Sequence, residues 1–198
     1  MEQKKEEILP IFKNPHKVLR AHTAQIPPGH IRSREIGKLI LDMKRTLAAT
    51  PDGVGLAAPQ VGKPLALFIV SEEAHEIDKA EKQGWERRRS RAIDETREKP
   101  YEKREWKYYT FINPAVKNRS RKKINGPEGC LSVPGTFGTV ARHEKITVTA
   151  YDEQGKKFIR GASRFFARVI QHELDHLAGI LFIDKADGIF DADPKKND

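Results

Sequence analysis

The feature that most constrains the fold is one amphipathic segment near the C-terminus, ASRFFARVIQHELDHLAG, at residues 162–179. Its apolar residues recur at helical spacing, so it is the strongest helix prediction in the sequence. Two histidines lie on the apolar face of this helix, where unpaired imidazoles would be costly to bury. The stripe consists of Phe165, Val169, His172 and His176. The chain therefore has to pack other elements around a helix that carries polar groups on its buried side.

The stretch QHELDH at residues 171–176 has the pattern H-E-x-x-H. Because His172 and His176 are four residues apart, both rings reach toward the same point beside the helix. Neutral imidazole suits a divalent transition metal, and Glu173 is placed to exchange a proton with water that the metal activates. Two core histidines bonded to the backbone are the alternative, but that alternative does not account for the acid between them. The pattern predicts metal-assisted hydrolysis.

A catalytic metal site needs a third protein ligand, and the residues after His176 do not supply one of the usual kinds. Phe182 stands where the long zinc-protease pattern places its third histidine, and no glutamate follows His176. The third ligand is therefore expected upstream, and Cys130, the one cysteine of the chain, is the candidate. A Cys/His/His set suits Fe(II), Zn(II), Ni(II) or Co(II).

The other segments predict more strands than helices. The periodicity favours a helix within 31–50, a buried strand at 64–70, a strand at 107–116, a Gly/Pro-rich loop around Cys130 at 122–135, and a hairpin at 144–161. Together they predict an α+β fold, with antiparallel or mixed sheets packed around the helix that carries the H-E-x-x-H pattern.

The length of 198 residues suits a single domain, here residues 1–198, with a charged insertion at about 72–107. That segment holds 11 basic and 11 acidic residues, whereas the rest holds 26 basic and 17 acidic and accounts for the net charge of +9. The basic excess suits work near polyanions such as RNA, although a solubility preference explains it as well. Since no RNA-binding motif accompanies the charge, no sequence-specific nucleic-acid binding is expected.

No apolar run is long enough to span a membrane, and the N-terminus MEQKKEEILPIF lacks the features of a secretory or transit peptide. A cytoplasmic location with no membrane partner is therefore expected.

Three stretches, in this order, resemble the signature motifs of the peptide deformylase family: GVGLAAPQ at 53–60, EGCLS at 128–132 and QHELDH at 171–176. The resemblance implies that Cys130, His172 and His176 bind one divalent metal ion, Fe(II) first and Zn, Ni or Co as alternatives. Glu173 is then the catalytic acid/base. The implied substrate is the N-formylmethionyl nascent peptide, and the implied reaction is removal of its formyl group. The segment 72–107 departs from the family pattern. The tail is too short for the C-terminal helix with which some members dock on the ribosome, so transient ribosome association is left as an open possibility.

The resemblance also implies roles around the metal. The side-chain amide of Gln60 and the backbone N–H of Leu131 occupy the positions that stabilise the oxyanion. Gly53 and Gly55 let the backbone approach an extended peptide. The candidate pocket for the methionine side chain consists of Val54, Phe165, Val169 and the flank of His172.

Asp175 is expected to orient a neighbour rather than to bind the metal. Arg142 is its candidate partner, since a buried carboxylate near a metal should be paired, although a plain surface arginine is the alternative.

Two other functions fit parts of the sequence. A zinc-type metallopeptidase shares the H-E-x-x-H pattern, but it should lack Cys130 as a ligand. A ribosome- or RNA-associated binding protein on an inactive enzyme scaffold would explain the basic charge and the charged insertion, but each residue that the hydrolytic chemistry needs is present. Steep salt dependence of RNA binding without metal-dependent turnover would identify the latter.

Overall fold

The structure is a computed structural model that describes residues 7–50, 53–77 and 107–191. Most of the expected charged insertion, residues 78–106, and the tail, residues 192–198, lie outside the described residues. Within the part that is described, residues 73–77 are helical, and no helix is long and apolar enough to cross a membrane.

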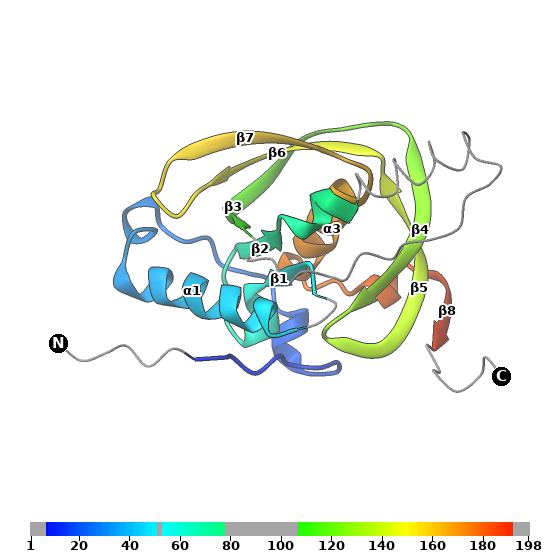
Figure 1. The fold of residues 1–198 in the computed structure, drawn as a ribbon, viewed down its shortest axis with the longest axis horizontal. Coiled ribbons are helices and arrows are strands. Elements are labelled where there is room, and N and C mark those ends of the chain that lie inside the picture. Colours follow the sequence, from blue (N-terminus) through cyan, green and yellow to red (C-terminus); the bar gives the residue numbers. More distant parts are fainter. Residues whose placement is uncertain (1–6, 51–52, 78–106, 192–198) are drawn as a thin grey trace, which may run out of the picture.

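Two antiparallel sheets form the framework (Figure 1). The five-stranded sheet has the order β1 (Gly55–Ala57), β2 (Leu67–Ser71), β3 (Tyr108–Arg119), β6 (Lys145–Tyr151) and β7 (Lys157–Ser163). The three-stranded sheet has the order β4 (Lys123–Cys130), β5 (Val133–His143) and β8 (Asp187–Asp191). The expected hairpin is formed by β6 and β7, which pair antiparallel along their whole length.

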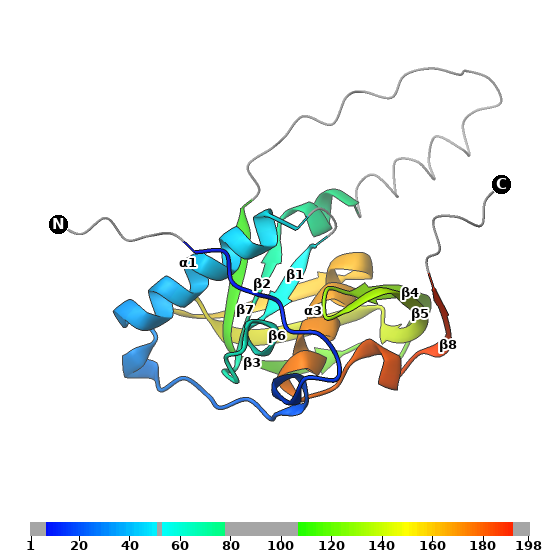
Figure 2. The ribbon, with the colours of Figure 1, turned by 90° about the horizontal axis from the view of Figure 1, so that it is seen from below.

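Besides the helical residues 73–77, the described residues form two longer α-helices and four short 3-10 helices. They are α1 (Arg34–Ala48), α3 (Arg164–Leu177), η1 (Lys17–Arg20), η2 (Pro28–His30), η3 (Ala58–Val61) and η4 (Phe182–Asp184). The helix α3 lies between the five-stranded sheet and the β4–β5 pair (Figure 2), so the predicted α+β fold around this helix is confirmed.

The strand β2 is buried on both faces, which explains its continuous apolar sequence. Phe68 and Val70 belong to the core packed against α3, whereas Leu67 and Ile69 belong to the core packed against α1. Because successive side chains of a strand point to opposite faces, an unbroken apolar run is stable only where both faces are covered. One face of the five-stranded sheet thus packs against α3, and the other face packs against α1.

The loop expected at 122–135 is wrong, because this segment forms all of β4 and the beginning of β5. Pro127 is compatible with a strand here because β4 is at the edge of its sheet, where a missing N–H does not break the ladder. A Cβ at Gly126 would lie 2.8 Å from Nη2 of Arg168, so the glycine marks a close approach of α3 rather than a turn. The strand ends at Cys130 and thereby fixes this residue opposite α3.

Candidate active site

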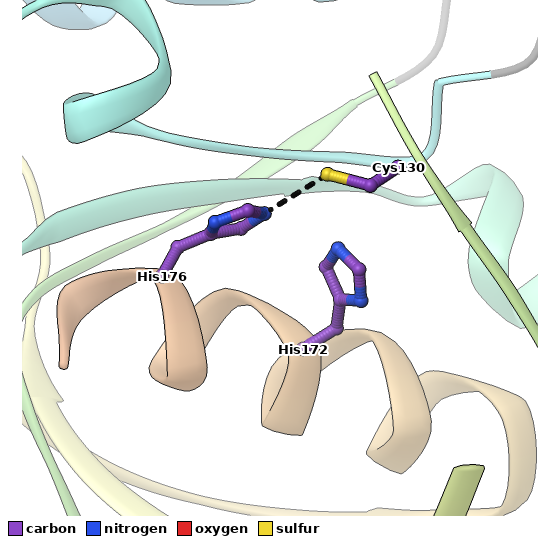
Figure 3. Close-up of side chains that lie close together, drawn as sticks. All are labelled: Cys130, His172 and His176. Atoms are coloured by element: carbon purple, nitrogen blue, oxygen red, sulfur yellow. Dashed lines mark hydrogen bonds between the residues drawn. The ribbon is translucent and has the colours of Figure 1, made fainter. Parts of the chain in front are cut away.

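The three predicted metal ligands converge between the end of β4 and the helix α3 (Figure 3). His172 and His176 project from the same side of α3 toward Cys130, as their spacing predicts. One ligand atom from each of the three residues lies within 4.8 Å of the others, and Cys130 Sγ is 3.2 Å from His176 Nε2.

The two histidines have opposite pKa shifts. Burial, together with the charge of His172, holds the pKa of His176 well below its usual range, so this ring is the neutral imidazole that a metal requires. Burial also lowers the pKa of His172, but hydrogen bonds to Cys130 and Glu128 outweigh burial and raise it to about 10. The acceptors around His172 therefore stabilise a positive charge on this ring, and a bound metal ion would have to displace that proton. One thiolate and two imidazoles form a three-donor set of the catalytic kind, which suits a transition metal.

Glu128 is a buried carboxylate that the sequence reasoning missed. Its Oε2 accepts a hydrogen bond from His172 Nδ1 at 3.0 Å, which leaves Nε2 of that ring for a metal. Arg142 donates from Nε and Nη2 to the two carboxylate oxygens, both at 2.8 Å, and Arg168 Nη1 donates to Oε1 at 2.8 Å. The available signal was its position two residues before Cys130 in EGCLS.

The expected pairing of Asp175 with Arg142 is confirmed. Arg142 Nη1 contacts Asp175 Oδ2, and Lys185 Nζ lies 2.6 Å from the other carboxylate oxygen. Arg142 is only 5% exposed, which excludes the alternative of a plain surface arginine. Asp175 therefore helps to hold the guanidinium that in turn holds Glu128.

Glu173 is 3% exposed, and its Oε2 has no hydrogen-bond partner among the described residues. Burial raises the pKa of this carboxyl to about 7, against a smaller opposing effect of His172. A group with a pKa near neutrality can accept and return a proton at neutral pH, which is what an acid/base catalyst needs.

The predicted site residues surround one cavity of about 410 Å³. Its lining includes Gly53, Val54, Gly55, Gln60, Cys130, Leu131, Phe165, Val169, His172 and Glu173. His176 is 1% exposed and completes the ligand set next to the cavity. The lining also includes Lys13, residues 133–137 of β5, and Arg168, for which the sequence reasoning had assigned no place in the site.

The profile of the family described as polypeptide deformylase matches residues 8–190. The chain belongs to this family. It is 38% identical over 185 residues to peptide deformylase 1A, chloroplastic/mitochondrial, of Arabidopsis thaliana, covering 93% of this chain and 64% of that protein. It is 35% identical over 178 residues to peptide deformylase 1 of Bacillus cereus, covering 90% and 92%. The chain thus spans less than two thirds of the plant relative and nearly all of the bacterial one.

A solved structure agrees with this assignment. The class I type b peptide deformylase from Acinetobacter baumannii superposes with a TM-score of 0.71 at 30% identity, covering 90% of this chain and 99% of that one. The similarity to the peptide deformylase family therefore extends from the sequence to the fold.

In this deformylase-family cavity, Gln60 is held in a single orientation. Its Oε1 accepts the N–H of Ala57 at 2.8 Å, so its Nε2 is directed toward Ser132 Oγ at 3.2 Å and Cys130 Sγ at 3.6 Å. The side chain is buried, with only 2% of the residue exposed. The amide donor expected to face the oxyanion is therefore fixed before any substrate binds, as electrostatic stabilisation requires.

Replacement of Gly55 by alanine is expected to disturb Glu173 more than the fold. A Cβ at Gly55 would lie 2.3 Å from Glu173 Oε1 and 3.1 Å from Val169 Cγ1, so the carboxylate has to shift from its position. We expect a reaction that uses Glu173 to slow by about tenfold or more, since small displacements of a reacting group are costly. Gly37→Ala is the matched control, because a Cβ there meets nothing within 4 Å. Equal activity of the two variants would show that Glu173 does not need this position.

Proposed function

We propose that the chain is a metal-dependent hydrolase that removes the N-formyl group from the initiator methionine of newly made polypeptides and releases formate. The observation that carries this proposal is the buried Glu173 carboxylate, which lines the same cavity as the ligand residues Cys130 and His172 in a chain of the deformylase family.

Cys130, His172 and His176 would hold one divalent metal ion, which when bound supplies a Lewis acid and lowers the pKa of water. We propose Fe(II) as the native ion, with Zn, Ni or Co as alternatives, because the set of one sulfur and two nitrogen donors suits these metals. Metal analysis of protein purified without oxygen tests this assignment, and a predominance of Zn after anaerobic purification would exclude Fe(II).

Several residues of this chain have distinct roles in the proposed reaction. Glu173 accepts a proton from the attacking water and delivers a proton to the leaving amine as the formyl C–N bond breaks. The Gln60 amide and the backbone N–H of Leu131 stabilise the negative charge that develops on the formyl oxygen. The products are formate and a peptide with a free amino group.

The remaining lining residues fit the proposed peptide substrate. Gly53 and Gly55 line the cavity, where residues without a side chain would let the backbone pair with an extended peptide. Val54, Phe165 and Val169 provide apolar surface on which the methionine side chain would pack.

Formate release from a short formyl-Met peptide tests the proposed activity. The reaction should proceed with Fe(II) under anaerobic conditions and should be lost when a chelator removes the metal. Cleavage of the same peptide at an internal bond would instead indicate a metallopeptidase. If folded, metal-loaded protein releases no formate and binds RNA with steep salt dependence, the enzyme proposal fails in favour of a binding protein.

We also propose transient association with the ribosome in the cytoplasm, where formylated nascent chains arise. The support is a run of exposed cations at the junction of β3 and β4: Lys117, Arg119, Arg121, Lys122 and Lys123. Cations at such a surface attract phosphate in a salt-dependent way. Reversal of Arg119, Arg121 and Lys123 to glutamate should weaken co-sedimentation with ribosomes while formate release from a small peptide is retained. Unchanged co-sedimentation would exclude this surface.

We propose that residues 1–198 act as one catalytic domain that carries the charged insertion at about 72–107. The packing of α3 against strands of both sheets supports a single domain. A single calorimetric unfolding transition is expected, and two separate transitions would contradict it.

A further inference from the structure

The N-terminal segment contacts both of the elements that carry the proposed oxyanion donors. The backbone N–H of Phe12 donates to the carbonyl of Gln60 at 2.8 Å, and the N–H of Asn14 donates to the carbonyl of Ser132 at 2.9 Å. Between them, the ammonium of Lys13 donates to the backbone carbonyl of Leu131. These contacts hold Lys13 next to the turn that follows Cys130, although Lys13 and this turn are far apart in the sequence.

The carbonyl of Leu131 belongs to the same peptide group as the N–H of Ser132. That N–H donates to Cys130 Sγ at 3.4 Å. A continuous chain therefore runs from the ammonium of Lys13 through one peptide group to the sulfur. Hydrogen bonds in a chain polarise one another, and a charged donor at one end strengthens the bond at the other.

We propose that Lys13 tunes the Cys130 thiolate, and with it the bound metal, through the Leu131–Ser132 peptide group. Withdrawal of electron density from the carbonyl makes the Ser132 N–H a stronger donor to the sulfur. Hydrogen bonds to a coordinating thiolate reduce its donation to the metal, and such outer contacts adjust metal-site properties. Lys13 is then a positioning and tuning residue rather than a catalytic one. The inference rests on the proposed metal site, but it does not depend on the reaction performed there.

The two ways in which Lys13 could act on the sulfur respond differently to salt. Lys13 is exposed, so its field acting directly through space is screened by salt. Polarisation through the buried Ser132, which is 0% exposed, is not screened in this way. An effect that persists at high salt therefore identifies the peptide group as the route.

The test uses the whole 198-residue chain loaded with Co(II), whose sulfur-to-metal charge-transfer absorption reports the electron density on the thiolate. Lys13→Met should shift this band to longer wavelength, because a weaker hydrogen bond raises the energy of the sulfur electrons. In the Zn-loaded protein, the Ser132 amide proton resonance should move upfield. Lys13→Arg should retain both wild-type signals, and Lys17→Met is the matched control at a neighbouring exposed lysine. Both shifts should persist in 1 M salt.

The possible outcomes distinguish a failure of the inference alone from a failure of the proposed metal site. If the wild type shows no sulfur-to-Co(II) band, the assignment of Cys130 as a ligand fails, and the inference fails with it. If the wild-type band is present and Lys13→Met leaves both signals unchanged, only the inference is overturned. Shifts that vanish in 1 M salt, or that Lys17→Met reproduces, would also overturn the route through the peptide group. Lys13→Gln provides a second neutral variant should Lys13→Met not fold.

Discussion

Glutamine in place of Glu173 should lower the rate of formate release by about a hundred- to ten-thousand-fold, the usual contribution of a general acid/base. The amide has nearly the same shape as the carboxyl group, but it cannot accept a proton from water at neutral pH. Because Glu173 is not among the three ligand residues, metal content should stay at the wild-type level. Steady-state kinetics and metal analysis on the same preparations measure the two effects together.

Glu35→Gln, on the exposed side of α1, is the matched control and should retain activity. Activity of Glu173→Gln within a few-fold of the wild type would remove Glu173 from the mechanism. Loss of metal in parallel with activity would instead indicate that this carboxylate supports the ligands.

The same replacement should raise stability at pH 8 in the presence of a chelator. Burial raises the pKa of Glu173 from 4.5 to about 7. The folded state therefore holds this proton more tightly than the unfolded state does, and stability is lost as pH rises from about 4.5 through 7. Glutamine does not ionise, so Glu173→Gln avoids this loss. A higher melting temperature together with lower activity would mark Glu173 as a group kept for function at a cost in stability.

The periodic parts of the sequence predicted the centre of the fold. The spacing of His172 and His176, and the apolar run of β2, are local patterns whose meaning depends little on the rest of the chain. The segment around Cys130 was misread as a loop because its glycines and proline are usual in turns. In the structure Gly126 and Pro127 belong to the edge strand β4, and Arg168 packs closely against Gly126, which depends on the position of α3.

The contacts that support the ligands could not be predicted for a similar reason. Glu128, Arg142 and Arg168 belong to β4, β5 and α3, and they meet only when these three elements pack together. Lys13 reaches the turn after Cys130 from an N-terminal segment without helix or strand of its own. No local pattern marks such residues, whereas the pairing of Asp175 with Arg142 could be expected from the cost of burying a lone carboxylate.

The two buried carboxylates near His172 have opposite pKa shifts. Burial raises the pKa of Glu128 too, but hydrogen bonds from Arg142 and His172 outweigh burial and lower it to about 2. Glu173 has no arginine within hydrogen-bond distance among the described residues, and its pKa rises to about 7. Environments that push two pKa values apart separate a permanent anion from a proton carrier. Glu128 therefore orients the ligand, and Glu173 remains free to move protons.

Glu128→Gln should produce the largest loss of stability of the changes considered. The neutral amide leaves Arg168 with a buried positive charge that lacks its carboxylate and leaves Arg142 with Asp175 alone, and breaking such a buried pair costs about 3–5 kcal/mol. It also removes the charged acceptor for His172 Nδ1, so metal affinity should fall by about 10- to 100-fold. Urea unfolding of chelated protein and competition with a metal indicator measure the two losses separately.

The matched control is Glu144→Gln, which breaks the solvent-facing pair with Lys122 and should cost at most about 1 kcal/mol. The pH dependence provides a second check. Since the pKa of Glu128 falls from 4.5 to about 2 on folding, its contribution is complete above pH 4.5 and is lost as pH falls toward 2. The stability difference between wild type and Glu128→Gln should therefore shrink across this window. A difference that stays constant would mean that the variant acts through packing, and the carboxylate would then not be the anion that holds both arginines and the ligand.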